Sequence, residues 1–345
     1  MQVTSLYRNR LLKGEVLVKS ILFSGCAIMI NAIPRSLAIV AVSAFFATFV
    51  TTFDSMYVVD RSNYIVHFYS ADIILSSYWS GGIVSFLANE PLWRLMNYAL
   101  LHLFGDAEVA IKSYVFVSAF IAAYCIISYD LRFFVLLVGF LLLPQFLKNY
   151  IAHLRQGVAI SVFLMAWLGM SGKKGGGVAL LTPFIHSSFF FVLLVVLVQK
   201  TFYFMNISVG LRFIFFFLAM VGFSMFSLVV AQQLGARQSQ YELFEVAGTG
   251  KAFVFWLVIF FLYVSQGSEF LERHMPAMGI LGFYLATYFF LPVAARIFES
   301  GLILILLASL SLTRERLLLF YYLFMFYFIF DWYPRIGLEG FGWIR

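Results

Sequence analysis

The chain has 345 residues, of which 63% are hydrophobic and only 11% are charged, and its mean hydropathy is +0.96. Soluble domains carry about 25% charged residues, so this composition excludes a soluble enzyme, a disordered chain and a fibrous repeat. The net charge of +7 fits either the usual excess of Lys and Arg in cytoplasmic loops or a basic cavity for an anionic substrate. Apolar runs longer than the roughly 18 residues that cross a bilayer recur along the chain and predict a polytopic membrane protein.

A backbone that crosses lipid must satisfy its own hydrogen bonds, so the predicted fold class is an all-α helix bundle. We treat residues 1–345 as a single transmembrane domain. A hydropathy window of about 19 residues predicts about eleven spans. In chain order they are 16–33, 36–53, 109–128, 131–147, 154–170, 178–198, 209–230, 252–266, 276–294, 297–312 and 316–331.

Two longer segments, 54–107 and 231–251, separate the predicted spans. In the first, apolar residues between Pro91 and Phe104 recur at helical spacing, which predicts an amphipathic helix. Such a helix lies in the membrane interface rather than crossing it.

The basic pair Lys173 and Lys174 lies in a short segment that we predict to be a tight loop, and no acidic residue is near it. This places the loop in the cytoplasm. Counting spans back from it places 148–154 and 54–107 on the opposite, outer side.

Two features of this topology stay open. The basic N-terminus also favours the cytoplasm, although two full spans at 16–33 and 36–53 would place it outside. Segment 178–198 either crosses fully or is broken near His186, which is tolerated where irregular backbone lines a cavity. We favour the broken form.

Ionisable residues at membrane boundaries are costly in lipid and indicate function. Ordinary structural roles compete in each case: an interfacial loop, a helix N-terminus, a snorkelling arginine, an interior histidine or a local ion pair. Five places stand out, namely Asp60 with Arg61 and Tyr64, Glu90 with Trp93, His153 with Arg155 and Gln156, His186 with Ser188, and Arg296 with Glu299.

Together these places offer several arginines, two or three carboxylates and a histidine around one outer-facing cavity. Such a set suits a lipid that bears phosphate or pyrophosphate, because Arg donates bidentately to phosphate oxygens and a carboxylate or His can act as a base. The histidines lack ligand spacing, and Cys26 and Cys125 lie inside apolar runs, so we expect no metal and no cofactor.

The order of these motifs resembles that of the EpsG-like branch of Wzy-type bacterial polysaccharide polymerases. The resemblance runs from about the second predicted span to the tenth, and the basic N-terminal segment departs from it. The matching elements are an Asp-x-x-x-Tyr at Asp60 to Tyr64, a Glu at Glu90, an Arg-Gln-Gly-x-Ala from Arg155 to Ala159, a His-x-Ser at His186 to Ser188, a Tyr-containing loop from Tyr241 to Gly250, and an Arg at Arg296.

The resemblance implies a GT-C-like, metal-independent glycosyltransferase at the outer, periplasmic face of the bacterial inner membrane. It would join repeat units carried on undecaprenyl pyrophosphate and release undecaprenyl pyrophosphate. A chain-length regulator and the flippase of the same pathway would be its partners, and nucleic acid would not.

The implied site has three kinds of residue. Arg155 and Arg296 would stabilise the leaving pyrophosphate, and His186, Asp60 and Glu90 are alternative bases. The expected substrate-binding residues are Arg61, Tyr64, Trp93, Gln156, Ser188 and Tyr241. An O-antigen ligase and a lipid-linked oligosaccharide flippase remain as alternatives, although flippases usually show internal repeats, which we do not find here.

Overall fold

The computed structural model describes residues 35–53, 57–58, 60–205, 210–212, 214–216, 218–219, 221–222, 250–289, 291 and 294–344. Its regular elements are helical, and strand-like pairing within these residues is confined to one antiparallel bridge between Val58 and Ile344. The all-α prediction is confirmed for this part of the chain. Span 16–33, Tyr241, more than half of span 209–230 and nearly all of loop 231–251 lie outside the described residues.

Three described helices are long and apolar enough to cross a membrane: Ala107–Ile127, Ala294–Ser311 and Arg314–Arg335. They match the predicted spans 109–128, 297–312 and 316–331. Shorter apolar helices stand at four other predicted positions, and they are α3 (Arg35–Thr51), α11 (Leu154–Leu164) continued by the π-helix η2 (Met165–Gly169), α15 (Lys251–Val264) and α17 (Met275–Thr287). The length and apolar composition of these helices are those expected of a membrane protein.

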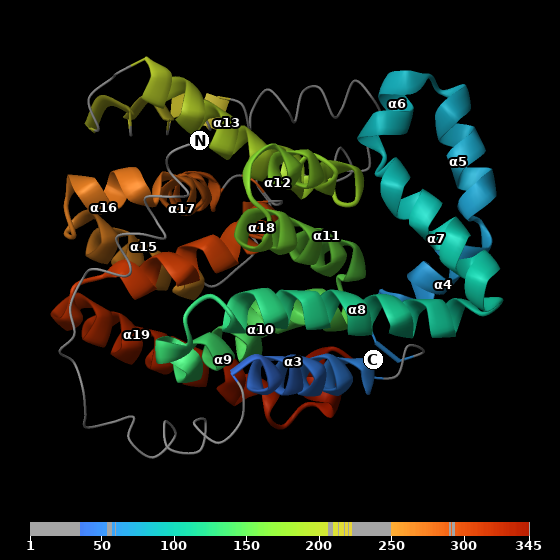
Figure 1. Ribbon diagram of the computed structural model, residues 1–345, viewed down its shortest axis with the longest axis horizontal. Coiled ribbons are helices and arrows are strands. Elements are labelled where there is room, and N and C mark those ends of the chain that lie inside the picture. Colours follow the sequence, from blue (N-terminus) through green and yellow to red (C-terminus); the bar gives the residue numbers. More distant parts are fainter. Residues whose placement is uncertain are drawn as a thin grey trace.

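The long helices are α8 (Ala107–Ile127), α18 (Ala294–Ala308) and α19 (Arg314–Trp332). Helices α3 and α11 pack on α8, α17 packs on α18, and α15 packs on both α17 and α19. Figure 1 shows α3, α8 and α19 running across the view, with a separate arm of helices at the right-hand end, turned across the direction of α8. The arm comprises α4 (Arg61–Tyr69), α5 (Ala71–Ser80), α6 (Ile83–Ala88) and α7 (Pro91–Phe104).

Helix α7 confirms the helix predicted from Pro91 to Phe104, because it begins and ends at these residues. Proline at the first position and Gly105 in a left-handed conformation after the last residue explain where α7 begins and ends. The sequence did not predict the three shorter helices before it, because they have only nine, ten and six residues and a helical period is recognised over longer windows.

The predicted span 131–147 is not straight. It forms η1 (Leu131–Phe133), α9 (Phe134–Leu142) and α10 (Pro144–Ile151), and the two halves meet at an angle of 60°. Leu143 is extended because the proline ring that follows disfavours the helical conformation. The bend directs α10 towards the residues that begin α11.

Segment 178–198 is also interrupted. Helix α12 (Gly172–Ala179) and the short η3 (Thr182–Phe184) precede His186, and α13 (Ser188–Phe204) follows it. The break near His186 agrees with the broken alternative.

The tight loop predicted around Lys173 and Lys174 is wrong, because these residues lie in α12. A Cβ on Gly175 would lie 2.7 Å from the carbonyl oxygen of Ala166. Close packing of α12 on η2 explains why a glycine-rich stretch forms a helix here.

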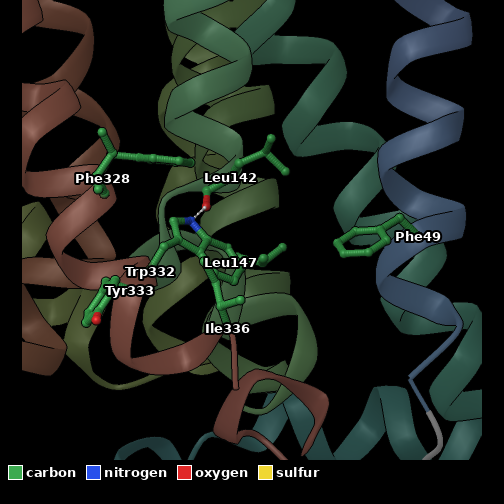
Figure 2. Close-up of a pocket in the computed structure, with 8 residues that line it drawn as sticks. Phe49, Leu142, Leu147, Phe328, Trp332, Tyr333 and Ile336 are labelled. Atoms are coloured by element: carbon green, nitrogen blue, oxygen red, sulfur yellow. Dashed lines mark hydrogen bonds between the residues drawn. The ribbon is translucent and has the colours of Figure 1, made fainter. Parts of the chain in front are cut away.

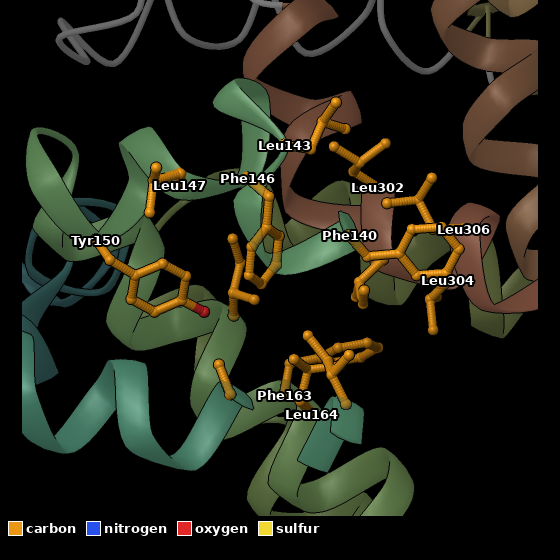
Figure 3. Packing of buried hydrophobic residues seen from close by; sticks show 14 of the residues in the cluster. Phe140, Leu143, Phe146, Leu147, Tyr150, Phe163, Leu164, Leu302, Leu304 and Leu306 are labelled. Carbon is orange, nitrogen blue, oxygen red and sulfur yellow. The ribbon is translucent and has the colours of Figure 1, made fainter. Parts of the chain in front are cut away.

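The core of the bundle is aromatic and aliphatic. Figure 3 shows Phe140 from α9, Phe146 and Tyr150 from α10 and Phe163 from α11 packed near leucines of α18. These four aromatic side chains are fully buried. The bent α9–α10 segment is thereby fixed against α11 and α18.

Helices α10 and α11 approach each other closely at Gly157. A Cβ at this position would overlap the carbonyl oxygen of Asn149 and lie 3.3 Å from the Cδ1 atom of Tyr150. The glycine of the Arg-Gln-Gly motif is therefore required for packing, and it places Arg155 beside the end of α10.

We predict that Gly157→Ala destabilises the protein by about 1–3 kcal/mol, because the added methyl group clashes with the backbone carbonyl of Asn149 and the helices must move apart. Thermal unfolding in detergent micelles measures the effect. Gly176→Ala is the matched control, since nothing lies within 4 Å of that Cβ and alanine favours a helix by about 1 kcal/mol. Equal melting temperatures for the two variants would contradict the close approach.

Candidate functional site

Glu90 lies at the centre of a buried polar cluster. It precedes α7 with a φ of 58°, a left-handed conformation that is uncommon outside glycine. Its Oε2 accepts a hydrogen bond from Nη1 of Arg155. Its Oε1 lies 3.0 Å from Nδ1 of His186 and accepts from the backbone N–H of Ser187, also at 3.0 Å. One carboxylate therefore joins the arm, α11 and the break before α13.

These donors decide the charge of Glu90. Burial alone would raise its pKa, but Arg155, His186 and the N–H of Ser187 together hold the pKa well below its usual range. Glu90 is therefore an acceptor at neutral pH, and the Nδ1 atom of His186 carries the proton that it receives. Both oxygens are engaged, so Glu90 positions its neighbours and is poorly placed to take a proton from substrate.

Arg155 is held by two contacts, the ion pair with Glu90 and the aromatic ring of Tyr64. The centre of its guanidinium lies 5.9 Å from the centroid of that ring. Tyr64 in turn packs edge-on against Trp93 at 5.8 Å, and Trp93 stacks on Tyr114 at 5.0 Å. Trp93 and Tyr64 are buried, so their contacts favour support of Arg155 over direct stacking on a sugar.

Asp60 forms a second carboxylate–histidine pair. It too has a left-handed backbone, with a φ of 68°, and its Oδ2 lies 3.6 Å from Nδ1 of His153. The histidine lowers the pKa of Asp60, partial burial opposes this, and the charges of Arg296 and Arg155 lower it further. Asp60 is thus ionised and within electrostatic range of both arginines.

The starts of five helices meet here. Asp60, Glu90 and His153 directly precede α4, α7 and α11, and none of them uses its side chain to cap its own helix. Arg296 lies in the first turn of α18, and His186 lies just before α13. Helix N-termini carry partial positive charge, so this arrangement favours an anionic ligand.

Gln156 and Ser188 take part in a buried network behind these groups. Gln156 donates from Nε2 to the carbonyl oxygen of Arg296 at 2.9 Å and to Oγ of Ser300 at 3.0 Å. The hydroxyls of Ser188 and Ser300 lie 2.6 Å apart. These bonds join α11, α13 and α18, so they fix the start of α18 and the position of Arg296. They favour a supporting role over substrate contact.

Arg61 is fully buried. It donates from Nε to the carbonyl oxygen of Ile151 at 2.8 Å and from Nη1 to that of Phe53 at 2.7 Å. These bonds join the end of α3, the start of α4 and the end of α10. They give Arg61 a structural role in holding Asp60 near His153.

The structure therefore places five predicted side chains near one another, namely Asp60, Glu90, Arg155, His186 and Arg296. The sequence singled out His153 beside Arg155 but gave it no role in the site, and it did not single out Ser300, which lies one helical turn after Arg296. It paired Arg296 with Glu299 as the local alternative, whereas Oε1 of Glu299 lies 2.7 Å from Nζ of Lys148.

Among the described residues, no group of three or more His, Cys, Asp or Glu side chains is placed to hold a metal ion. Comparisons of the chain with protein-family models, curated proteins and solved structures find no match. Function is therefore inferred from the chemistry of this site.

We predict that Glu90→Ala lowers the free energy of unfolding by about 3–5 kcal/mol, because it leaves the buried charge of Arg155 without its carboxylate. Chemical denaturation in detergent micelles measures this value. Glu108→Ala is the control, because Glu108 forms an exposed ion pair with Lys112 on α8 and its loss costs about 1 kcal/mol or less. Similar losses in both variants would show that the Glu90 cluster is no more than a surface ion pair.

Proposed function

We propose that the protein polymerises oligosaccharide repeat units carried on undecaprenyl pyrophosphate. The growing glycan is transferred from its lipid to a new lipid-linked repeat, and undecaprenyl pyrophosphate is released. The observation that carries this proposal is the meeting of Arg155 and Arg296 with two carboxylate–histidine pairs at the starts of five helices. All of these groups except His153 belong to the motifs that resemble the polymerase family, and they come from segments far apart in the chain.

The arginines act on the pyrophosphate. Charge develops on the leaving group during transfer, and preorganised cations aimed there give the largest single contribution to the rate. The ion pair with Glu90 occupies Nη1 of Arg155, and a guanidinium has five N–H donors in all. The Nε atom of Arg155 is buried, so the donors that remain for phosphate oxygens are those of its Nη atoms and the guanidinium of Arg296, while the helix N-termini add their dipoles.

The reaction needs no metal in this scheme, as is usual for lipid-dependent glycosyltransferases of the GT-C type that the family resembles. We propose a bundle of about eleven spans in the bacterial inner membrane with the site facing the periplasm. A chain-length regulator and the pathway's flippase are its proposed partners. The order of motifs and the membrane-type helices support this assignment.

An apolar groove suits the lipid tail of the substrate. It has a volume of about 330 Å³ and lies between α3 and α19. Figure 2 shows Phe49 facing Leu147 and Trp332 across it, and Nε1 of Trp332 donates to the carbonyl oxygen of Leu142 at 3.0 Å. Leu147 precedes Lys148, which pairs with Glu299 one turn after Arg296. An isoprenoid chain in this groove would thus have its pyrophosphate near the arginines.

The primary test uses purified protein in detergent, a synthetic undecaprenyl-pyrophosphate-linked repeat unit and EDTA, with products separated on a gel. We expect a ladder of multimers with the chelator present. A second reaction adds a lipid A core acceptor, and transfer to that acceptor alone would identify a ligase instead. A third uses the same lipid in proteoliposomes, where movement across the membrane without any transfer would identify a flippase.

We predict that Arg155→Ala and Arg296→Ala each slow ladder formation about 10²–10³-fold, because each removes a donor worth about 2.7–4 kcal/mol at the transition state. Rates of the purified variants at matched protein concentration measure the loss. Arg273→Ala is the control, since Arg273 pairs with Glu269 on its own helix, α16 (Ser268–Arg273). Wild-type ladders from both site variants would refute the assignment.

We predict that Ile336→Trp raises the KM for a full-length polyprenyl donor about tenfold, because the larger ring displaces roughly two methylene groups of the tail from the groove. The KM for a donor whose pyrophosphate carries no isoprenoid tail should not change. Leu318→Trp, on the exposed surface of α19 outside the groove, controls for an added ring. An equal rise for both donors would place the tail elsewhere.

A further inference from the structure

The site contains two histidine–carboxylate pairs, and they differ in exposure. The side chains of His186 and Glu90 are 13% and 9% exposed, whereas those of His153 and Asp60 are 29% and 43% exposed. The Nε2 atom of His186 is buried and has no hydrogen-bond partner. A substrate hydroxyl therefore has no access to that atom, although it can approach the other pair.

We propose that His153 is the general base that activates the acceptor hydroxyl, with Asp60 as its orienting partner. This inference rests on the polymerase function proposed above and adds a catalytic residue to it. The two pairs then have different roles. Glu90 and His186 hold Arg155 in place, whereas Asp60 and His153 act on the incoming sugar.

The orientation of the ring supports this role. The Nδ1 atom of His153 faces Oδ2 of Asp60 at 3.6 Å, so the opposite ring nitrogen, Nε2, points away from the carboxylate. A negative charge on the Nδ1 side favours the tautomer with its proton there and stabilises the imidazolium that forms during proton transfer. A general base must come within hydrogen-bond reach of the proton that it removes, and the partly exposed ring of His153 leaves room for such an approach.

The position of the pair supports it further. His153 is two residues before Arg155, and Asp60 lies within electrostatic range of both Arg155 and Arg296. The arginines hold the leaving pyrophosphate in the proposed reaction, so the base lies beside the carbon that is attacked. Asp60 also has a left-handed backbone, and residues in this conformation are concentrated at functional sites.

In the proposed step, the acceptor hydroxyl gives its proton to Nε2 of His153 while its oxygen forms a bond to the anomeric carbon of the donor glycan. The bond from that carbon to the pyrophosphate oxygen breaks, and its electron pair leaves on undecaprenyl pyrophosphate. The imidazolium then releases its proton to water, which restores the neutral ring.

The test compares His153→Ala with the wild type in two measurements: the rate of ladder formation and the binding of undecaprenyl pyrophosphate. We expect the rate to fall about 10²–10⁴-fold while the Kd for the lipid stays within about threefold. Added imidazole should restore part of the rate, which a purely structural role would not allow. His102→Ala is the matched control, because His102 is exposed and its Nδ1 atom lies 3.0 Å from the carbonyl oxygen of Tyr98 on its own helix.

A second variant keeps the experiment decisive if His153→Ala does not fold. Asp60→Asn keeps the shape of the side chain, and its loss of rate should be smaller than that of His153→Gln and not additive with it. A rate within about threefold of wild type in the His153 variants, or a Kd that rises in parallel with the loss of rate, would overturn the base assignment. If the wild-type protein forms ladders while either of these results is obtained, only the base assignment fails and the polymerase proposal stands. Wild-type protein that forms no ladder refutes the polymerase proposal and this assignment with it.

Discussion

The arrangement of the site depends on one buried charge. A carboxylate withdrawn from water is unstable unless donors surround it, and Glu90 obtains them from α11 and from the break before α13. Because Glu90 begins α7, these bonds also fix the arm of helices against the bundle. Arg155 is fixed in the same way, by the carboxylate and the ring of Tyr64. The ion pair therefore fixes Arg155 and joins the arm to the bundle.

Interrupted helices make this arrangement possible. The bend at Pro144 and the break near His186 expose backbone groups that lipid would not tolerate, so both must be enclosed by protein. Enclosure is achieved by the packing of α10 on α11 at Gly157 and by the serine network that Gln156 completes. The result is that several helix N-termini lie near the same place as Arg155 and Arg296.

The sequence allowed the prediction of the charged groups and their common location, because ionisable residues at membrane boundaries are few and each needs a partner. It also predicted α7 and the three longest spans, where apolar runs are long and regular. It could not distinguish Arg61, whose contacts are backbone carbonyls of residues 53 and 151, from an arginine that faces substrate. Nor could it show that Gln156 and Ser188 face Ser300, because helix rotation is set by packing that a single sequence does not reveal.

The difference between the two carboxylates follows from what surrounds them. Both have strained, left-handed backbones at a helix start and both face a histidine, yet Glu90 has each oxygen engaged in a dry setting whereas Asp60 stays partly exposed. A dry, fully bonded carboxylate resists rearrangement and is suited to holding an arginine in position. A partly exposed one can follow the changing charge of its histidine during proton transfer. A carboxylate paired with a histidine thus gives rigidity at Glu90 and, in the mechanism that we propose, assists proton transfer at Asp60.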